Sequence, residues 1–283
     1  MARVAFLGLG RMGAPMAANL AKAHHVVGYD PAVETAAPSA VAAVSGADVV
    51  ITMLPGGRQV LDVYAAVLAA APPGTLFVDC STIDVADARE AAALVVAAGH
   101  RAVDAPVSGG VAGAAAGTLT FMVGGDVEAA RSVLEPMAGR IVPCGDHGAG
   151  QAAKICNNMM LGISMIGISE AFVLGEKLGL SNQAFYDVAS TASGQCWALT
   201  ANCPVPGPVP ASPANHDYRP GFATALMDKD LGLAAGAVRA NGVDGRLGLL
   251  AREIYRRFTE ESGGELDFSA IVNDIRRRSG TEE

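Results

Sequence analysis

Short runs rich in β-branched and aromatic residues alternate with alanine-rich stretches of helical length through the first half of the chain. Strands that alternate with helices in this way form βαβ units, so the pattern predicts a mostly parallel, doubly wound sheet. The predicted strands are Val4–Leu7, Val26–Tyr29, Val49–Leu54, Leu76–Asp79, Ala102–Ala105 and Leu119–Val123.

The pattern changes near residue 150, and helical periodicity then continues to the end of the chain. The predicted helices are 151–180, 182–192, 223–241, 245–263 and 268–278. We therefore predict an α/β fold with two domains: a doubly wound sheet in residues 1–150, and an all-helical domain in residues 151–283 that begins with a long interdomain helix. The segment Cys203–Pro220 holds six prolines, so we expect a long irregular loop there.

Charge and composition narrow the class of partner. The 283 residues are 51% hydrophobic and carry a formal net charge of −8, and nucleic acid or an anionic membrane would favour a basic face instead. The apolar stretch Met159–Val173 is shorter than the ~20 residues of a membrane span, and no leader pattern opens the sequence, so we expect a cytoplasmic protein.

The cysteines and histidines show no ligand spacing, so no metal is expected. Arg276–Arg278, at the end of the last helix, are expected to be solvated.

A GxGxxG motif follows the first predicted strand and opens a helix, which is the context of a dinucleotide-binding loop. The first glycine makes the turn, the second lets the backbone approach a pyrophosphate, and the third allows close packing. Asp30 ends the next strand, where its carboxylate can accept a bond from a ribose 2′-hydroxyl and repel a 2′-phosphate. This favours NAD over NADP, although Arg11 could touch either phosphate. The candidate cofactor contacts are Gly8, Leu9, Gly10, Arg11, Met12, Gly13 and Asp30.

Two further strand ends are predicted at the same edge of the sheet. Leu54 ends the third predicted strand and Pro55 follows it, and Thr82 follows the fourth. Because nucleotides lie at the carboxyl edge of such sheets, these residues are further candidate cofactor contacts. Ordinary loop chemistry is the alternative.

Ser108, Gly109 and Gly110 follow the fifth predicted strand. A serine hydroxyl and successive exposed N–H groups can bind an anion such as a carboxylate. A glycine-rich turn without a ligand is the alternative.

Lys154 lies in an apolar helical run, and Asn158, four residues later, shares its helix face. Removal from water favours the neutral amine, which can accept a proton, and a neighbouring amide can hold a substrate oxygen. The pair therefore predicts a proton-transfer site, with a solvated lysine at a helix start as the alternative.

Four motifs, which span nearly the whole chain, resemble those of the β-hydroxyacid dehydrogenases and come in the same order. They are Gly8–Gly13, Asp104–Gly125, Gly148–Asn158 and Met227–Ala234. The resemblance implies a Rossmann-type domain with a helical domain, and NAD-dependent oxidation of a small β-hydroxyacid. Segment 193–231 is most similar to the valine-catabolism branch of that family, which implies 3-hydroxyisobutyrate as the substrate.

The resemblance also implies a role for each matching residue. Lys154 matches the catalytic lysine, Asn158 the asparagine that acts beside it, and Asn157 a further substrate contact. Ser108–Gly110 matches the carboxylate-binding segment, and Lys229 a lysine that reaches the nicotinamide cofactor. For Lys229 the alternative is a surface ion pair with a neighbouring aspartate.

Other functions stay open on the sequence alone. A tartronate semialdehyde or succinic semialdehyde reductase of the same superfamily would use the same lysine, whereas imine reductases usually replace it. A non-catalytic dinucleotide sensor would keep the glycine motif and Asp30 but would not need Lys154 with Asn158. The apolar excess of the helical half predicts a homodimer or homotetramer.

Overall fold

The computed structural model describes residues 1–262 and 264–280, and the contacts divide the chain into two units. The first unit is Met1–Lys154 and the second is Ile155–Glu283. This division and the predicted boundary at residue 150 both fall in the first turns of one long helix, α7 (Ala149–Lys177).

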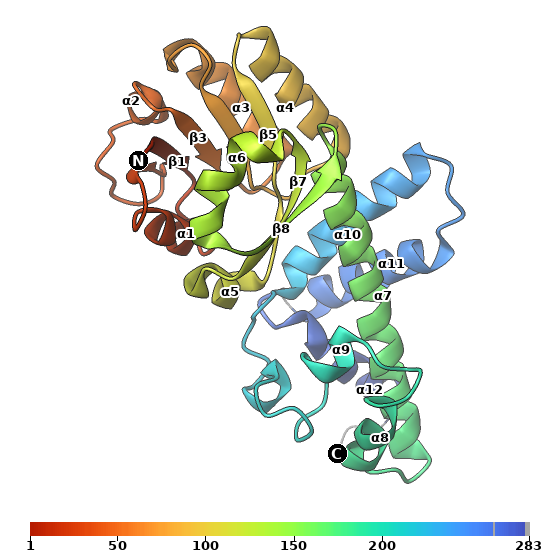
Figure 1. Cartoon of the computed structure of the whole chain (residues 1–283). Coiled ribbons are helices and arrows are strands. Elements are labelled where there is room, and N and C mark those ends of the chain that lie inside the picture. Colours follow the sequence, from red (N-terminus) through yellow and green to blue (C-terminus); the bar gives the residue numbers. More distant parts are fainter. Residues whose placement is uncertain (263, 281–283) are drawn as a thin grey trace. The chain divides into compact units, whose positions relative to one another are not determined.

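An eight-stranded sheet forms the centre of the first unit (Figure 1). Its order is β2-β1-β3-β4-β5-β7-β6, with β8 beside β7. The strands are β1 (Arg3–Leu7), β2 (His25–Tyr29), β3 (Val49–Thr52), β4 (Leu76–Asp79), β5 (Arg101–Asp104), β6 (Val107–Ser108), β7 (Leu119–Gly125) and β8 (Ala138–Gly145). The first five pair in parallel, whereas β7 runs antiparallel to β5 and β6 and parallel to β8.

Helices cover both faces of this sheet, because successive strand residues point to opposite sides. In β1, Val4 and Phe6 join a core with α1, α5 and α6, whereas Ala5 and Leu7 join a core with α2, α3 and α4. The helices are α1 (Gly13–Leu20), α2 (Ala40–Val44), α3 (Gly57–Val67), α4 (Val85–Ala97), α5 (Gly110–Ala116) and α6 (Val127–Leu134), with 3₁₀ turns at Leu68–Ala70 and Glu135–Met137. The predicted doubly wound sheet is confirmed.

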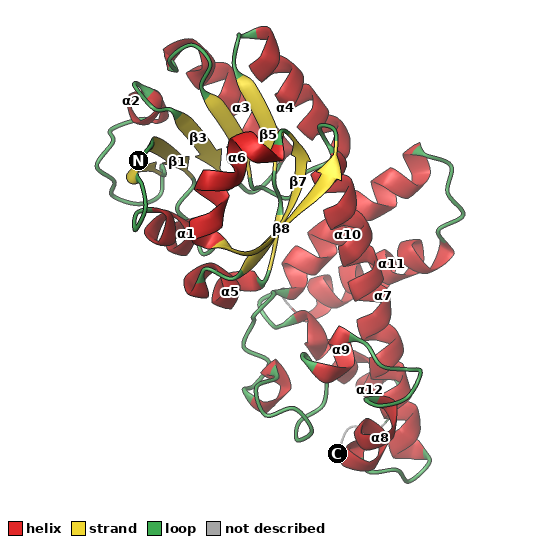
Figure 2. Ribbon diagram, in the orientation of Figure 1, coloured by secondary structure: helices red, strands yellow, loops and turns green. Residues whose placement is uncertain are grey.

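Helices joined by loops make up the second unit (Figure 2). They are the rest of α7, then α8 (Asn182–Ala189), α9 (Trp197–Thr200), α10 (Thr224–Ala240), α11 (Arg246–Ser262) and α12 (Ile271–Arg278), with 3₁₀ turns at Pro213–Asn215 and Phe268–Ala270. Their core includes Met165 and Phe172 of α7 and Tyr255 of α11, all buried. The predicted all-helical second half is confirmed.

The helix α7 is longer than its apolar stretch Met159–Val173 suggested, and at 29 residues it has the length and composition of a membrane span. One face of the helix supplies buried side chains to the core of the second unit. Met160, Leu174 and Leu178 are exposed apolar residues on or next to the same helix.

The segment Cys203–Pro220 is irregular apart from the turn Pro213–Asn215, as expected from its prolines. Internal hydrogen bonds order it. The Tyr218 hydroxyl donates to Pro204 O at 2.9 Å, and the Asn215 side chain accepts from Gly207 N and donates to Val209 O, both at 2.8 Å.

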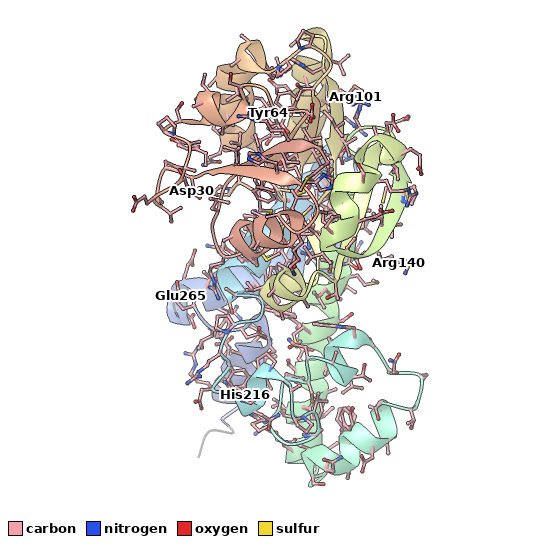
Figure 3. The ribbon with its side chains drawn as sticks, turned by 60° about the vertical axis from the view of Figure 1, so that its left-hand side comes forward. Asp30, Tyr64, Arg101, Arg140, His216 and Glu265 are labelled. Atoms are coloured by element: carbon pink, nitrogen blue, oxygen red, sulfur yellow. The ribbon has the colours of Figure 1, made fainter. Side chains whose placement is uncertain are left out.

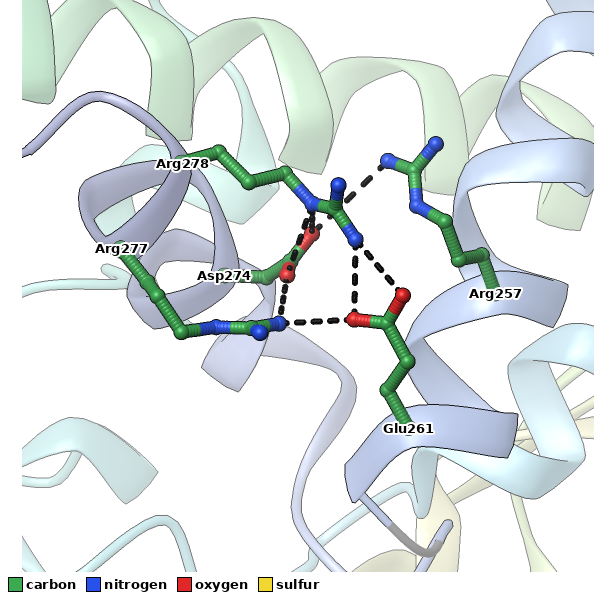
Figure 4. A network of polar contacts seen from close by, with 5 residues as sticks. All are labelled: Arg257, Glu261, Asp274, Arg277 and Arg278. Carbon is green, nitrogen blue, oxygen red and sulfur yellow. Dashed lines mark hydrogen bonds and ion pairs between the residues drawn. The ribbon is translucent and has the colours of Figure 1, made fainter.

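The expectation that Arg276–Arg278 are solvated is confirmed in part: Arg277 and Arg278 are exposed but form ion pairs (Figure 4), whereas Arg276 is mostly covered. Arg277 and Arg278 of α12 bond Asp274 on the same helix and Glu261 of α11, and Arg276 pairs with Glu176 of α7. The Asp274 side chain is buried, so the ion pairs compensate a carboxylate that burial alone would destabilise. These contacts fasten α12 to the rest of the helical unit.

Candidate active site

The glycine motif forms the turn between β1 and α1, and the structure requires glycine at two of its positions. Gly8 has φ +99°, and a Cβ there would lie 2.3 Å from Met53 O. A Cβ on Gly13 would lie 1.9 Å from Gly8 O, so any side chain would push α1 off the strand. A Cβ on Gly10 would meet no atom within 4 Å, so the backbone there borders open space that a phosphate group can approach.

The start of α1 suits an anion. Its N-cap residue, Met12, makes no side-chain bond to the helix, and its first turn holds no acidic residue. The positive end of the helix dipole is therefore not offset by a protein carboxylate. These features of the loop and the helix fit the pyrophosphate of a dinucleotide.

Asp30 follows β2 and holds the glycine loop in place (Figure 3). Its Oδ2 accepts from Leu9 N at 2.7 Å and its Oδ1 from Ala32 N at 2.8 Å. The side chain stays half-exposed, so it can also accept a bond from a ribose hydroxyl. The residues directly after it, Pro31–Glu34, include no cation that would hold a 2′-phosphate.

A buried polar network joins the ends of β3 and β4. Leu54 N donates to Ser81 Oγ at 2.8 Å, and Ser81 N donates to Asp79 Oδ1 at 3.1 Å. Thr52 Oγ1 donates to the same oxygen at 2.7 Å, so the Tyr64 hydroxyl, 3.3 Å from Thr52, must donate to Thr52. The loops that carry Leu54–Pro55 and Thr82 are thus tied together through Ser81.

Asp79 has an unusual environment for a carboxyl group. Burial raises its pKa, and the bonds from Ser81 and Thr52 offset part of this effect. Its Oδ2 is buried and has no hydrogen-bond partner among the residues that the structure describes. The hydrogen bonds to Asp79 are therefore all accepted by Oδ1, from Ser81 N and Thr52 Oγ1.

The predicted anion-binding segment lies where β6 passes into α5. Ser108 pairs with Thr120 of β7, and its side chain is half-buried. Gly109 has φ +133°, a conformation that other residues rarely adopt, so the glycine is required by the turn whether or not a ligand binds. Asn19 of α1 donates to Ala114 O of α5 at 2.7 Å, which links this segment to the helix of the glycine loop.

The first turn of α7 is anchored at the carboxyl edge of the sheet. Asp104, at the end of β5, accepts from Gly148 N at 2.7 Å and from Gln151 N at 3.1 Å. The Gln151 amide bonds Ser81 O at 2.7 Å and Ile83 N at 3.1 Å. Lys154 comes one turn later and is only 7% exposed, so the solvated-surface alternative does not describe it.

Asn158 lies one turn beyond Lys154 on α7 and contacts α10. It is 2% exposed, and its Nδ2 donates to Asp230 Oδ2 at 2.6 Å, while its Oδ1 accepts from Asn157 at 3.0 Å. Asp230 therefore fixes the orientation of the Asn158 amide. Lys229 precedes Asp230, and the other neighbouring aspartate, Asp228, pairs with Arg252 of α11.

Several residues of this site were not among the predicted site residues, and they include Asp104, Gln151 and Asp230. Asp104, Gln151 and Asp230 each lie within one of the four motifs, and each contacts a residue more than 40 positions away. The signal in the sequence was weak: a carboxylate at a strand end, an amide in an apolar helix start, and an acid beside Lys229. Among the described residues, no group of three or more His, Cys, Asp or Glu that could hold a metal is present.

Comparisons with known proteins match both units. Residues 3–145 match a family model described as the NAD binding domain of 6-phosphogluconate dehydrogenase. Residues 148–275 match one described as NAD-binding of NADP-dependent 3-hydroxyisobutyrate dehydrogenase.

Similar whole chains are also known. A probable 3-hydroxyisobutyrate dehydrogenase of Mycobacterium tuberculosis strain H37Rv is 58% identical, over 99% of each chain. An NAD-dependent L-serine dehydrogenase of Pseudomonas aeruginosa is 45% identical, over 96% of this chain and 97% of that one. A solved structure of Mycobacterium tuberculosis 3-hydroxyisobutyrate dehydrogenase with L-serine matches with a TM-score of 0.94 and 58% identity, over 98% of this chain and 99% of that chain.

The fold and the glycine loop define a nicotinamide-dependent dehydrogenase of hydroxyacids. The chain belongs to the 3-hydroxyisobutyrate dehydrogenase family, and both of its units match nicotinamide-dinucleotide-binding family models. The predicted family, enzyme class and cofactor are thereby confirmed, whereas the roles of the individual site residues stay predictions.

Proposed function

We propose that this enzyme oxidises 3-hydroxyisobutyrate to methylmalonate semialdehyde in valine catabolism, with Lys154 as the general base. The observation that carries the proposal is the buried Lys154 on a helix whose first turn is bonded to the loop after β4. The whole-chain similarity to a probable 3-hydroxyisobutyrate dehydrogenase supports it.

The reaction removes a hydride from C3 and a proton from the C3 hydroxyl. NAD, when bound, accepts the hydride. The neutral Lys154 amine takes the hydroxyl proton, and in the reverse direction its ammonium returns that proton to the aldehyde oxygen. Asn158 donates from its amide to the same oxygen and so orients it.

Ser108, Gly109 and Gly110 are proposed to bind the substrate carboxylate. Asn157 is proposed as a further substrate contact, and Lys229 as a contact to the cofactor. In this arrangement Ser108–Gly110 bind the carboxylate at one end of the substrate, and Lys154 and Asn158 contact the C3 hydroxyl at the other end.

L-serine is a second candidate substrate, favoured by two comparisons. One relative is named an NAD-dependent L-serine dehydrogenase, and a similar structure was solved with L-serine. L-serine and 3-hydroxyisobutyrate share the carboxylate and the C3 hydroxyl and differ at C2, where serine carries an ammonium and hydroxyisobutyrate a methyl group. The environment of C2 therefore decides between them.

We also propose a cytoplasmic homodimer or homotetramer that binds neither nucleic acid nor a membrane. The helical unit supports the assembly, because Met160, Leu174, Leu178, Val188 and Trp197 are exposed apolar side chains in its helices and turns. Light scattering on the purified protein would test it, and a monomer at micromolar concentration would contradict it.

A substrate panel tests the proposed function. NADH formation is followed with (S)-3-hydroxyisobutyrate, L-serine, 3-hydroxypropionate, glycerate and 4-hydroxybutyrate. An apolar C2 pocket distinguishes one methyl group by about 1–3 kcal/mol, so 3-hydroxypropionate should show a kcat/KM about ten- to two-hundredfold lower. A higher kcat/KM for L-serine, glycerate or 4-hydroxybutyrate would reassign the substrate, and turnover of none would support a sensor. Methyl esters of these acids should be inactive if the carboxylate is bound.

A further inference from the structure

The buried side chain of Gln151 contacts the loop that follows β4. Gln151 is 0% exposed, and both ends of its amide are used: Nε2 donates to Ser81 O at 2.7 Å, and Oε1 accepts from Ile83 N at 3.1 Å. Ser81 O and Ile83 N flank Thr82, one of the predicted cofactor contacts. The amide therefore clamps the peptide backbone on both sides of Thr82.

The clamp reaches a second loop through Ser81. The Ser81 hydroxyl accepts from Leu54 N at 2.8 Å, so the segment Leu54–Pro55 after β3 is held by the same residue that Gln151 holds. A shift of the Gln151 side chain would therefore move the ends of two neighbouring strands, β3 and β4. Both ends carry predicted cofactor contacts.

Gln151 lies three residues before Lys154 on α7. Since a helix advances 1.5 Å per residue, Lys154 is about 4.5 Å farther along the axis, and the rigid first turn transmits the position of one residue to the other. The backbone N of Gln151 also donates to Asp104 at 3.1 Å, so both the backbone and the side chain of this residue are fixed.

We propose that Gln151 is a positioning residue for the reaction, which sets Lys154 at a defined distance from the cofactor-binding loops after β3 and β4. This inference rests on the proposed function of Lys154 as the proton acceptor. An apolar side chain of the same size would fill the space, but it would leave Ser81 O and Ile83 N without their buried partner and free the loop to shift. Small misplacements of reacting groups lower the rate steeply, so the effect should appear in kcat.

The first test compares Gln151→Met with a control of matched stability loss. Thr75→Val removes a hydroxyl at the opposite end of β4, whose single proton lies between two carbonyl oxygens, Ala47 O at 3.1 Å and Pro72 O at 2.6 Å from Thr75 Oγ1. We expect Gln151→Met to lower kcat by about ten- to a hundredfold and Thr75→Val to leave it within about twofold, while urea unfolding shows similar losses for both.

The second test uses Gln151→Glu, because a protonated glutamic acid reproduces both bonds. Its O–H can donate to Ser81 O and its carbonyl can accept from Ile83 N, whereas the ionised carboxylate would face the Ser81 carbonyl. The charged or titratable groups around this position are Asp104 of β5, Asp79 of β4 and Lys154 of α7. The Asp104 carboxylate disfavours a further negative charge, and the ionised side chain of the Gln151→Glu variant would also favour the ammonium form of Lys154.

The ratio of kcat for Gln151→Glu to kcat for the wild type should therefore fall by at least about tenfold as the pH rises through the ionisation of the new carboxyl. The same ratio for Gln151→Met should stay constant with pH. A merely structural role predicts wild-type kcat for the folded fraction of both variants, so that result would overturn the inference. Failure of the wild type to turn over any acid of the panel would instead overturn the proposed function. The failure of the inference about Gln151 can therefore be distinguished from the failure of the proposed function. If Gln151→Met does not fold, the pH dependence of Gln151→Glu still decides.

Discussion

Replacement of Asp30 by alanine should weaken NADH binding selectively. The change removes the acceptor for the ribose hydroxyls and two bonds that hold the loop, from Leu9 N at 2.7 Å and from Ala32 N at 2.8 Å. One bond to a charged group contributes about 1.5–3 kcal/mol, so loss of the ribose contact alone raises the Kd about 10- to 150-fold. The freed Leu9 amide adds to this loss, because the loop must be ordered again when the cofactor binds.

The affinity for NADPH should fall less than the affinity for NADH. The 2′-phosphate of NADPH is repelled by the Asp30 carboxylate, so removal of that charge offsets the lost loop contacts, and the ratio of NADPH to NADH affinity should rise. Protein fluorescence titrations with both cofactors measure the two values of Kd directly. An arginine in place of Pro31 in the same variant would raise the ratio further.

Asp48→Ala provides the matched control. Asp48 Oδ2 accepts from Arg3 N at 2.8 Å. This is also a bond from a backbone amide to a carboxylate, but it lies at the start of β1, whereas the bond from Leu9 N to Asp30 lies just after the end of β1. This variant should lose some stability to urea and keep both cofactor affinities. The reasoning fails if the wild type has the better kcat/KM with NADP, or if Asp30→Ala changes the Kd of NADH by less than about threefold.

Three further perturbations follow from the same structure. Lys154→Met should lower kcat about 10²–10⁴-fold while the Kd of NADH stays unchanged in titrations; a smaller loss would identify another base. Asp230→Asn removes the charged acceptor of the Asn158 amide, so steady-state kinetics should show a higher KM for the hydroxyacid and unchanged NADH binding, and wild-type KM would refute the link. Burial raises the pKa of Asp79, so between the unfolded and the folded pKa the folded chain keeps a proton that the unfolded chain releases; the contribution of Asp79 to stability is therefore full below the unfolded pKa and is lost as the pH rises through the folded one. Relative to Asp79→Asn, which does not titrate, the wild type should thus gain stability in urea melts as the pH is lowered, and a constant difference would contradict a raised pKa.

The sequence predicted those parts of the fold whose signal is local. Strands β1, β3, β4 and β5 are mostly buried on both faces, so they read as apolar runs, and the glycine motif marks the turn after β1. Strand β2 is a half-buried edge strand, but its sequence is also mostly apolar. Strands β6 and β8 escaped prediction for different reasons. β6 has only two residues, and β8 is a half-exposed edge strand that contains Arg140 and Pro143 and pairs with β7 alone.

The sequence predicted those residues of the candidate site that combine a reactive or charged side chain with a recognisable sequence motif. Lys154 and Asp30 stand out because a titratable group follows a recognisable pattern. The supporting residues Asp104 and Gln151 do not, because their importance depends on which distant backbone groups the fold brings to them. Asp79 is similar, because its raised pKa results from burial, which the sequence alone does not reveal.

The anchoring of α7 at its first turn has a consequence for how this segment can vary among related chains. Asp104 holds the N–H groups of Gly148 and Gln151, and a Cβ on Gly150 would lie 2.3 Å from Met122 O, so the helix starts against the sheet at a fixed residue. One residue inserted between Gly150 and Lys154 would turn the lysine by about 100° around the helix axis. Deletion of one residue would turn it by the same angle in the other direction. We therefore expect this stretch to accept changes of side chain but no change of length.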